Sequence, residues 1–395
     1  MTDAVIVSGA RTPIGSFGGA FKNVSAGDLG AAAIKASLRR AGLSPGDVDE
    51  VFFGNVLQAA EAGYAPRLSA IGAGIPYEVP SIAINRACSS GLEAINIAAQ
   101  FIRMGEVGIA VAGGTENMTQ APYYLDYTAR FDGLKLGEVT MRDGLIEGLS
   151  CPVNRYHMGR GAENISERYK ITRGDQDDLA LLSHQRAVAA VKDHRFDEQI
   201  VPVETRIEKG HSLRVASDEG PRDDTSLEKM AKLKPVFKDG GTVTAGNSAS
   251  INDGAAAVVI MSDTKASELG IEPKLRWHAR GIAGVDPAFY GTGPVPAVQR
   301  ALSKTSMTIN DVDLVELNEA FAVQALHNIR HLNLDIDKTN VNGSGISLGH
   351  PLGATGAIMT VRLMEEMDRR DAEVGLTTMC VGGGMGVATI FERIG

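Results

Sequence analysis

The clearest hydrophobic pattern in the chain surrounds residues 84–91. An apolar segment, Val79–Ile84, precedes this run, and the apolar residues after it follow Leu92 by three, seven and ten positions, as on one face of a helix. The pattern predicts a strand, a tight turn and a helix. Small polar residues that begin helices stand at the turn, and apolar residues follow on one face: Ser89, Ser90 and Gly91, then Leu92, Ile95, Ala99 and Ile102.

Cys88 is predicted to lie on this turn, at the start of the helix. The positive end of a helix dipole favours a thiolate, and the thiolate is the nucleophilic form of cysteine. Cys88 is therefore a candidate nucleophile. The alternative is an inert cysteine in the core, which is the more common role of an isolated cysteine.

Other short apolar segments alternate with a helical pattern in the first 120 residues. Val5–Ser8, Val48–Asn55 and Gly108–Ala112 have the length and composition of buried strands, and Asp28–Ala41 has the pattern of a helix. Glycine-rich turns separate these elements. Alternation of strands and helices predicts α/β layering around a largely parallel sheet.

The pattern changes between about Ala121 and Lys238, where charged residues are denser and the apolar periodicity breaks. Helices are expected at Met158–Tyr169, Gln176–Lys192 and Leu227–Leu233. This stretch is interpreted as an insertion into the sheet domain. A buried strand, Ala255–Met261, follows it.

The second half of the chain repeats the order of the first. Val312 occupies the place of Val48 at a distance of 264 residues, and His350 that of Cys88 at 262 residues. Cys380 follows Val111 by 269 residues, again before a glycine-rich turn. Three such similarities in order favour two similar α/β halves over chance resemblance.

Composition excludes several classes of function. The chain has 395 residues and a formal net charge of −9, which argues against nucleic acid as a partner because phosphate backbones require basic surfaces. Three widely spaced cysteines without a CxxC pair indicate neither a disulfide framework nor a metal site. No apolar run approaches the roughly 20 residues of a membrane helix, and no secretory signal is visible, so a cytoplasmic protein is expected.

Two further motifs carry candidate chemistry. His350 lies in a run of glycine, serine and threonine that lets the backbone approach a ligand, and histidine is the usual acid–base group near neutral pH. Cys380 precedes Gly382–Gly384, whose N–H groups could face an oxyanion. In open α/β sheets, sites form beyond the carboxyl ends of strands, so Cys88, His350, Cys380 and Asn318 are expected around one crevice. The alternatives are a capping histidine and a structural cysteine.

These motifs together resemble the thiolase family, over essentially the full chain. A single motif of this kind is weak, but this many motifs in the family's order are specific. The matching stretches are Gly9–Pro13, Cys88–Gly91, Gly113–Met118, Tyr156–Gly159, Thr242–Asn247 with Asn252–Ala257, Asn318–Phe321, Gly349–Pro351, and Cys380 with Gly382–Gly384.

The resemblance implies duplicated αβαβα halves in five layers with an inserted loop domain. The N-terminal half would comprise residues 1–120 and 248–271, the loop domain 121–247, and the C-terminal half 272–395. The loop domain would cover coenzyme A (CoA), and residues 133–148 resemble the segment by which tetrameric members associate. A homo-oligomer, as a dimer of dimers, is therefore expected.

The resemblance also implies a role for each catalytic residue. Cys88 would accept the acyl group as a thioester, and His350 would take the proton of Cys88. Cys380 would act as acid and base on the second substrate. Asn318, holding a water beside His350, would form one oxyanion hole, and the backbone N–H groups of Cys88 and Gly382 would form the other.

CoA contacts follow from the same resemblance. For the two lysines of the group, a solvated face is the alternative, because lysines are mostly exposed. Ala249 departs from the serine usual in the family, which puts that contact in doubt. The residues are His157, Met158, Arg222, Lys229, Lys232, Phe237, Ala245, Ser248, Ala249, Ser250 and Phe321.

The expected activity is that of an acetyl-CoA C-acetyltransferase, which joins two acetyl-CoA molecules without a metal or redox cofactor. Cys88-Ser89-Ser90-Gly91 is more typical of degradative members, whereas Lys135-Leu136-Gly137 and the ending Gly382–Gly386 resemble acetoacetyl-CoA thiolases. A broader 3-ketoacyl-CoA thiolase therefore stays open, as does the direction of the reaction. A CoA-binding scaffold without activity is the remote alternative.

Overall fold

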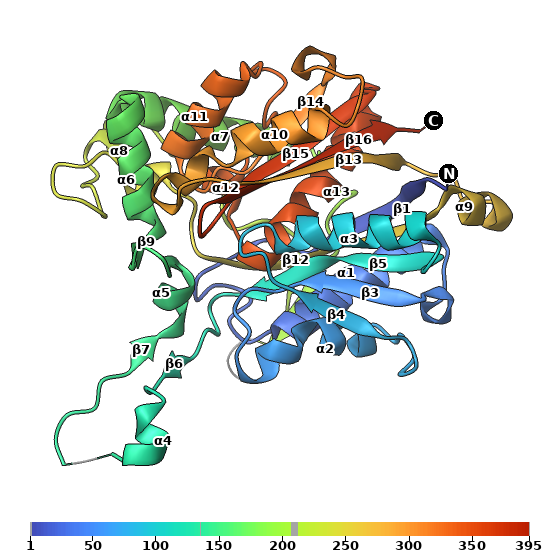
Figure 1. The fold of residues 1–395 in the computed structure, drawn as a ribbon, viewed down its shortest axis with the longest axis horizontal. Helices are drawn as coiled ribbons and strands as arrows, with labels where there is room; N and C mark the ends of the chain where they lie inside the picture. Colours follow the sequence, from blue (N-terminus) through green and yellow to red (C-terminus); the bar gives the residue numbers. More distant parts are fainter. Residues whose placement is uncertain (1, 135, 207–211, 395) are drawn as a thin grey trace.

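Two sets of strands meet edge to edge in the main sheet (Figure 1). The structure, a computed structural model, describes residues 2–134, 136–206 and 212–394. The strand order is β14-β15-β16-β13-β1-β12-β5-β3-β4, with β2 paired to β12, and β1 and β13 join the two sets through two residue pairs. We call the set from β1 to β4 in this order the N-terminal half and the set from β14 to β13 the C-terminal half. The bounds are β1 (Ala4–Arg11), β2 (Gly15–Ser16), β3 (Glu50–Gly54), β4 (Ser81–Ile84), β5 (Ile109–Asn117), β12 (Asn252–Ser262), β13 (Leu275–Gly284), β14 (Leu314–Leu317), β15 (Val374–Val381) and β16 (Met385–Arg393).

Strands β1, β5, β12, β14 and β15 are buried on both faces, which explains their almost continuous apolar sequences. In β1, Ile6 packs into one hydrophobic cluster, while Val5 and Val7 pack into another on the opposite face. Successive side chains of a strand point to opposite faces, so one strand serves both clusters.

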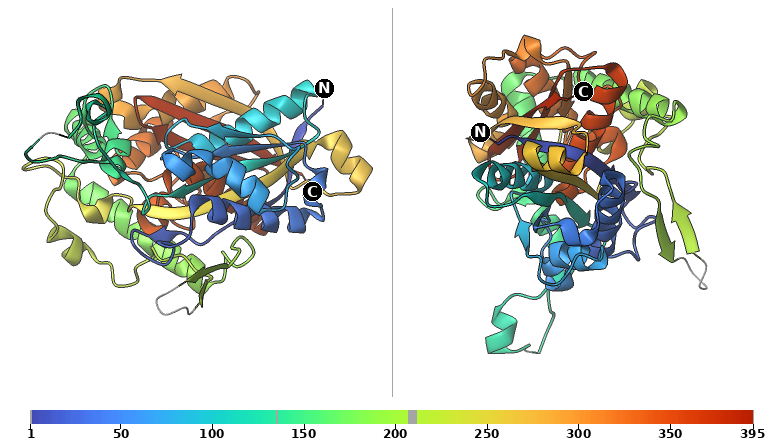
Figure 2. Two further views of the ribbon diagram at one scale, coloured as in Figure 1. Left: turned by 90° about the horizontal axis from the view of Figure 1, so that it is seen from below. Right: turned by 90° about the vertical axis from the view of Figure 1, so that its right-hand side faces the viewer.

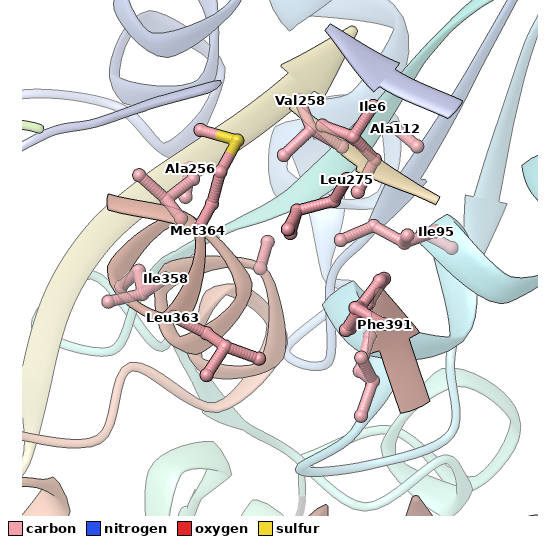
Figure 3. Close-up of a cluster of buried hydrophobic side chains, with 14 of the residues drawn as sticks. Ile6, Ile95, Ala112, Ala256, Val258, Leu275, Ile358, Leu363, Met364 and Phe391 are labelled. Carbon is pink, nitrogen blue, oxygen red and sulfur yellow. The ribbon is translucent and has the colours of Figure 1, made fainter. Parts of the chain in front are cut away.

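Helices α3 and α13 form the layer between the two halves of the sheet (Figure 1). Their apolar faces meet side chains from both halves, as Figure 3 shows for Ile95, Ile358 and Met364 around Ile6 and Phe391. Helices α1 and α2 cover the outer face of the N-terminal half, and α10 and α11 cover that of the C-terminal half. The five layers agree with the expected architecture. The bounds are α1 (Ala26–Ala41), α2 (Ala65–Gly72), α3 (Ser90–Met104), α9 (Asp263–Leu269), α10 (Pro294–Leu302), α11 (Ala322–Leu332), α12 (Gly345–Leu348) and α13 (Leu352–Arg370).

The prediction of a largely parallel sheet was wrong. Parallel ladders join β3 to β4, β3 to β5 and β14 to β15, whereas the remaining ladders of the main sheet are antiparallel. The physical reason is visible between β15 and β16, where residues 382–384 make the whole connection. A parallel pair needs a crossover of a dozen or more residues, so this short turn permits an antiparallel pair alone.

The internal repeat is visible in matching backbone caps. In the N-terminal half, the Asp49 carboxylate accepts hydrogen bonds from the N–H groups of Gly108 and Ile109 at the start of β5. In the C-terminal half, Asp313, 264 residues after Asp49, accepts from Glu373 and Val374 at the start of β15. An aspartate carboxylate at the equivalent position therefore fixes the equivalent pair of strands in each half.

Residues between β5 and β12 form the insertion, which lies beside the halves and carries an arm. The arm holds α4 and the β6–β7 pair and projects away from the body (Figures 1 and 2). Three helices fall where the sequence predicts them, within a few residues. The bounds are β6 (Tyr123–Tyr124), α4 (Thr128–Asp132), β7 (Arg142–Asp143), α5 (Gly144–Gly148), β8 (Ser150–Cys151), β9 (Tyr156–His157), α6 (Met158–Tyr169), α7 (Arg173–Lys192), β10 (Val203–Arg206), β11 (Ser212–Val215) and α8 (Leu227–Ala231).

No helix among the described residues is long and apolar enough to cross a membrane. Lys135, one of three residues used above to compare subgroups, lies outside the described residues.

Candidate active site

The amino-terminal ends of α3 and α13 are in direct contact through glycine. A Cβ atom on Gly91 would lie 2.7 Å from the carbonyl oxygen of Gly353, and one on Gly114 would lie 2.0 Å from the same oxygen. Such distances are shorter than real Cβ contacts, so these positions require glycine. The turns that precede the two helices carry Cys88 and His350, and the close approach places both turns at one site.

The turn before α3 is sharp, because Ala87 has a positive φ of 42°. Local side chains stabilise it. Asn85 Oδ1 accepts from the Ala87 N–H at 3.0 Å, and Ser90 Oγ accepts from the Arg86 N–H at 2.9 Å. Ser89 directs its hydroxyl back to the Arg86 carbonyl and not to the helix. The predicted strand, turn and helix around Cys88 are confirmed.

The electrostatics of Cys88 differ from the prediction. Burial raises the pKa of the Cys88 thiol, the N–H groups of Gly382 and of Cys88 itself lower it, and Glu116 raises it. Desolvation outweighs the favourable N–H groups, so the thiol is protonated at rest. The N–H groups at the start of the helix favour the thiolate, as expected, but they do not overcome desolvation, so a base must accept the proton.

Glu116 connects the elements around Cys88. Its carboxylate accepts from the backbone N–H groups of Val56, Leu57 and Gly353, and from the side-chain amide of Asn55. Burial raises the pKa of Glu116 to about 7, against the effect of the three backbone N–H groups. This side chain fixes the start of α13 against the loop after β3.

His350 is buried and has a partner on each ring nitrogen. Nδ1 lies 2.7 Å from Thr355 Oγ1, and Nε2 lies 3.4 Å from Asn318 Nδ2. The Thr355 hydroxyl is directed at the Pro351 carbonyl at 3.1 Å, so its oxygen accepts from Nδ1–H and Nε2 is left without a proton. Burial lowers the pKa of His350 to about 4, which keeps the ring neutral. His350 is thus an acceptor near neutral pH.

Cys380 ends its strand within the same site. It is fully buried, and burial raises its pKa well above the usual value, with a further contribution from Cys88. Gly382 lies beside both the nucleophile turn and α6: a Cβ there would be 3.9 Å from Ala87 Cβ and 3.8 Å from Met158 Sδ.

One pocket with a volume of about 380 Å³ contains the three groups. The expectation that Cys88, His350 and Cys380 open to one crevice is confirmed. Asn318 reaches this crevice through His350, and Gly382 through the Cys88 sulfur. Of the predicted CoA contacts, nine line the pocket: His157, Met158, Arg222, Phe237, Ala245, Ser248, Ala249, Ser250 and Phe321.

Lys229 and Lys232 do not line this pocket. Lys229 forms an exposed ion pair with Asp224, and Lys232 forms one with Glu228. The structure places both lysines on or beside the short helix α8, which is the solvated arrangement given above as the alternative.

Aromatic rings form one wall of the pocket. His157 stacks on Phe237 with ring centroids 4.7 Å apart, and Phe237 meets Phe321 edge to face at 5.9 Å. Next to this wall, the Ala249 N–H donates to the Ala320 carbonyl at 3.0 Å. A largely apolar, partly aromatic lining with a few polar groups is typical of a small-molecule site.

Several residues of the site were missed by sequence reasoning. Asn252 Oδ1 accepts from the His350 N–H at 2.9 Å and so holds the histidine turn, and Thr355 selects its tautomer. Asn252 stands in the stretch Asn252–Ala257 named above, and Thr355 belongs to the run of glycine, serine and threonine around His350, which is the signal that could have found them. Met118 and Ala320 also line the pocket and stand in such motifs. The pocket residues without such a signal are Leu149, Val236, Ile251, Tyr290 and Leu352.

Comparison with known proteins gives full-length matches. Residues 4–264 match the family description "Thiolase, N-terminal domain", and residues 271–393 match "Thiolase, C-terminal domain". An acetyl-CoA acetyltransferase of Cupriavidus necator is 48% identical over 394 residues, with 100% of both chains covered. A probable acetyl-CoA acyltransferase of Staphylococcus aureus is 46% identical, also with 100% of both covered.

Solved structures of similar proteins have the same fold over the full length of this chain. The crystal structure of the Bacillus anthracis acetyl-CoA acetyltransferase has a TM-score of 0.97 at 43% identity and covers 100% of this chain and 99% of its own. Human mitochondrial 3-ketoacyl-CoA thiolase in complex with CoA has a TM-score of 0.95 at 41% identity, covering 100% and 98%.

Proposed function

This chain belongs to the thiolase family and is an acyltransferase, and we propose that it exchanges acetyl groups between CoA thioesters as an acetyl-CoA C-acetyltransferase. The observation that carries the proposal is that two thiols and a neutral imidazole, from two turns and the end of β15, line one pocket. A broader 3-ketoacyl-CoA thiolase is the second candidate, because a 3-ketoacyl-CoA thiolase is among the similar structures.

The first half-reaction transfers an acetyl group to Cys88. His350 Nε2 accepts the thiol proton, and the sulfur attacks the thioester carbonyl of acetyl-CoA. The new C–S bond to Cys88 replaces the C–S bond to CoA, and Cys380 protonates the departing CoA thiolate. The oxyanion formed during the attack would lie near the N–H groups of Cys88 and Gly382. A donor of this kind contributes roughly 3 kcal/mol in other enzymes.

The second half-reaction forms the carbon–carbon bond. The Cys380 thiolate left by the first step removes a proton from the α-carbon of a second acetyl-CoA, whose enolate oxygen would face Asn318 and His350. The α-carbon attacks the acetyl thioester, and Cys88 leaves as a thiolate and recovers its proton from His350. The sum is two acetyl-CoA giving acetoacetyl-CoA and CoA. Every step transfers a proton or forms and breaks C–S and C–C bonds, so we expect no metal or redox cofactor.

The decisive experiment separates the two half-reactions. Wild-type protein incubated with acetyl-CoA should gain one acetyl group on the peptide that contains Cys88, as measured by mass spectrometry. Cys380→Ala should still be acetylated but should not form acetoacetyl-CoA, whereas Cys88→Ala should do neither. Cys151→Ala is the matched control, because Cys151 is buried and does not line the pocket. This variant should retain both activities. Unchanged exchange in Cys88→Ala would refute the assignment, and an inactive wild-type protein would favour the scaffold.

Two exposed apolar features support a dimer of dimers. β4 is the edge strand of the main sheet and carries Ile82, which is 44% exposed. The arm presents Tyr127 and Phe131, 75% and 77% exposed. Unpaired strand edges and apolar patches of this kind are typical interfaces. Light scattering should give the mass of a tetramer for the wild-type protein. Phe131→Asp should give dimers, and Ile82→Asp should give species smaller than a dimer.

We also propose a cytoplasmic location, with CoA thioesters as small-molecule substrates and without nucleic acid or membrane partners. The three free cysteines support a reducing compartment. The net charge of −9 argues against nucleic acid.

A further inference from the structure

Tyr290 stands at the inner end of the pocket. The pocket rim is exposed, with Val236 at 60% exposure, whereas Tyr290 lines the same pocket at 2%. Tyr290 shares a buried cluster with Cys380 and Phe321, on the wall that carries the second thiol. It belongs to the short 3₁₀ segment Pro287–Thr292, far in sequence from every motif discussed above.

The ring is held in place from behind. A Cβ atom on Gly161 in α6 would lie 2.8 Å from Tyr290 Cε1, so α6 is already in contact with the ring. The Tyr290 carbonyl accepts from the Gly293 N–H at 3.1 Å, which fixes the backbone. The ring has no room to withdraw toward α6 when a ligand enters, and close-packed interiors resist such displacement.

The space in front of the ring is where an acyl group on Cys88 must lie. Tyr290, Cys88 and Cys380 line the same pocket of about 380 Å³, and Tyr290 packs in one buried cluster with Cys380. Burial, followed by Cys380 and Cys88, raises the pKa of the Tyr290 phenol well above its usual value. The other side of the space is closed by apolar residues that pack with Cys88, including Met118 and Leu352. An acyl chain extending from Cys88 meets the ring on one side and these residues on the other.

Hydrogen bonding by its hydroxyl does not explain why a tyrosine occupies position 290. Among the described pocket-lining residues, Tyr290 has the one buried side-chain oxygen or nitrogen without a hydrogen-bond partner. An unpaired buried hydroxyl is unfavourable. The ring itself, as a rigid volume, is then the contribution of this residue to the pocket.

We propose that Tyr290 forms the end wall of the acyl pocket and restricts the acyl group transferred to Cys88 to short chains, in practice acetyl. This inference rests on the proposed function and names its substrate class. It selects the acetyl-CoA C-acetyltransferase over the broader thiolase by a physical limit on length.

The test compares the thiolysis of acetoacetyl-CoA, 3-ketohexanoyl-CoA and 3-ketooctanoyl-CoA. The readout is the ratio of kcat/KM for the six-carbon to the four-carbon substrate, which does not depend on how much protein is folded. One methylene in an apolar pocket changes kcat/KM by roughly 10- to 200-fold, so Tyr290→Ala and Tyr290→Leu should raise the ratio at least about tenfold. Tyr290→Phe, which keeps the ring, should leave the ratio unchanged.

Phe289→Ala is the control, because it removes the neighbouring ring, which does not line the pocket. The proposal is overturned if Tyr290→Ala and Tyr290→Leu keep the wild-type ratio, or if the wild-type protein cleaves the eight-carbon substrate as well as the four-carbon one. A ratio that shifts equally in Tyr290→Phe would assign selection to the hydroxyl and also overturn it. Failure of the proposed function looks different: no substrate would be cleaved by the wild-type protein, and Cys88 would not be acetylated.

Discussion

His350 Nδ1 and Thr355 Oγ1 lie 2.7 Å apart, and this contact decides which ring nitrogen is free to accept a proton. The Thr355 hydroxyl donates to the Pro351 carbonyl, so Nδ1 carries the hydrogen and Nε2 faces the pocket side with Asn318. Two residues in the first turn of α13 therefore set the state of the base.

Replacement of Thr355 tests this relationship. Thr355→Val should reduce the rate of Cys88 acetylation about fivefold, because a typical hydrogen bond contributes about 1 kcal/mol to the favoured tautomer. Thr355→Ser, which keeps the hydroxyl, should restore most of the rate. Stopped-flow measurement of acetylation, beside thermal unfolding, separates tautomer control from loss of fold. Wild-type acetylation in Thr355→Val would contradict the assignment.

The glycine contact between α3 and α13 gives a second prediction. Gly91→Ala should destabilise the protein by about 1–3 kcal/mol, because the new Cβ would lie 2.7 Å from the Gly353 oxygen and force the helices apart. Activity should fall about a hundredfold, since catalytic geometry tolerates little displacement. Urea unfolding and acetoacetyl-CoA thiolysis measure the two effects.

Gly46→Ala is the control for this change, because a Cβ there meets open space. Equal effects of the two substitutions would show that the close contact does not position the site.

Stability should decrease in mild acid because of buried neutral histidines. His327 is 3% exposed, and burial, followed by the neighbouring His331, lowers its pKa to about 4. The unfolded chain binds a proton at about 6.5, so between about pH 6.5 and 4 it holds a proton that the folded chain excludes. Stability is therefore lost as the pH falls through this range.

For His327 alone, the loss between pH 7 and 5 should be about 2 kcal/mol. The His327 and Tyr169 ring centroids lie 4.2 Å apart, and His327→Phe keeps a ring at this contact. This variant should lack the His327 part of the pH dependence of the free energy of unfolding in urea. His194→Asn, at a side chain that is 79% exposed, should change nothing. An unchanged slope in His327→Phe would argue against the prediction.

A buried ion pair gives the last prediction. Arg11 and Asp218 are both fully buried, with Nη1–Oδ1 and Nη2–Oδ2 distances of 2.7 and 3.0 Å. Asp218→Asn leaves an unpaired buried guanidinium and should cost about 3–5 kcal/mol in the free energy of unfolding. Asp224→Asn breaks the exposed pair with Lys229 and should cost far less, because exposed ion pairs contribute little to stability. A similar loss in the free energy of unfolding in both variants would contradict the prediction that burial makes the Arg11–Asp218 pair the more important of the two.

The sequence predicted elements best where local pattern and tertiary packing agree. The strand, turn and helix around Cys88 are of this kind, because the apolar face from Leu92 to Ile102 is the face buried between the two halves of the main sheet. The direction of most strand pairs could not be predicted, since β12 pairs with β1 and β5, which lie more than a hundred residues away in the chain.

Site chemistry was predictable by residue type but not by environment. Cys88 and His350 stand where motifs place them, yet their pKa values are set by desolvation, which a linear pattern does not contain. Tyr290 has no motif of its own, and its place against Gly161 and Cys380 results from folding alone.

The pairing of β5 with β12 also constrains how the protein is made. Ile109 is matched with Met261 and Asn117 with Asp253, so the whole insertion is synthesised between the two partners. At about 5–20 residues per second, a ribosome needs roughly 7–30 seconds to deliver β12 after β5. Throughout that interval one edge of β5 has no neighbour, and an unpaired edge readily captures strands from other chains. Nascent thiolase chains of this type should therefore depend on chaperone protection until residue 262 has left the exit tunnel.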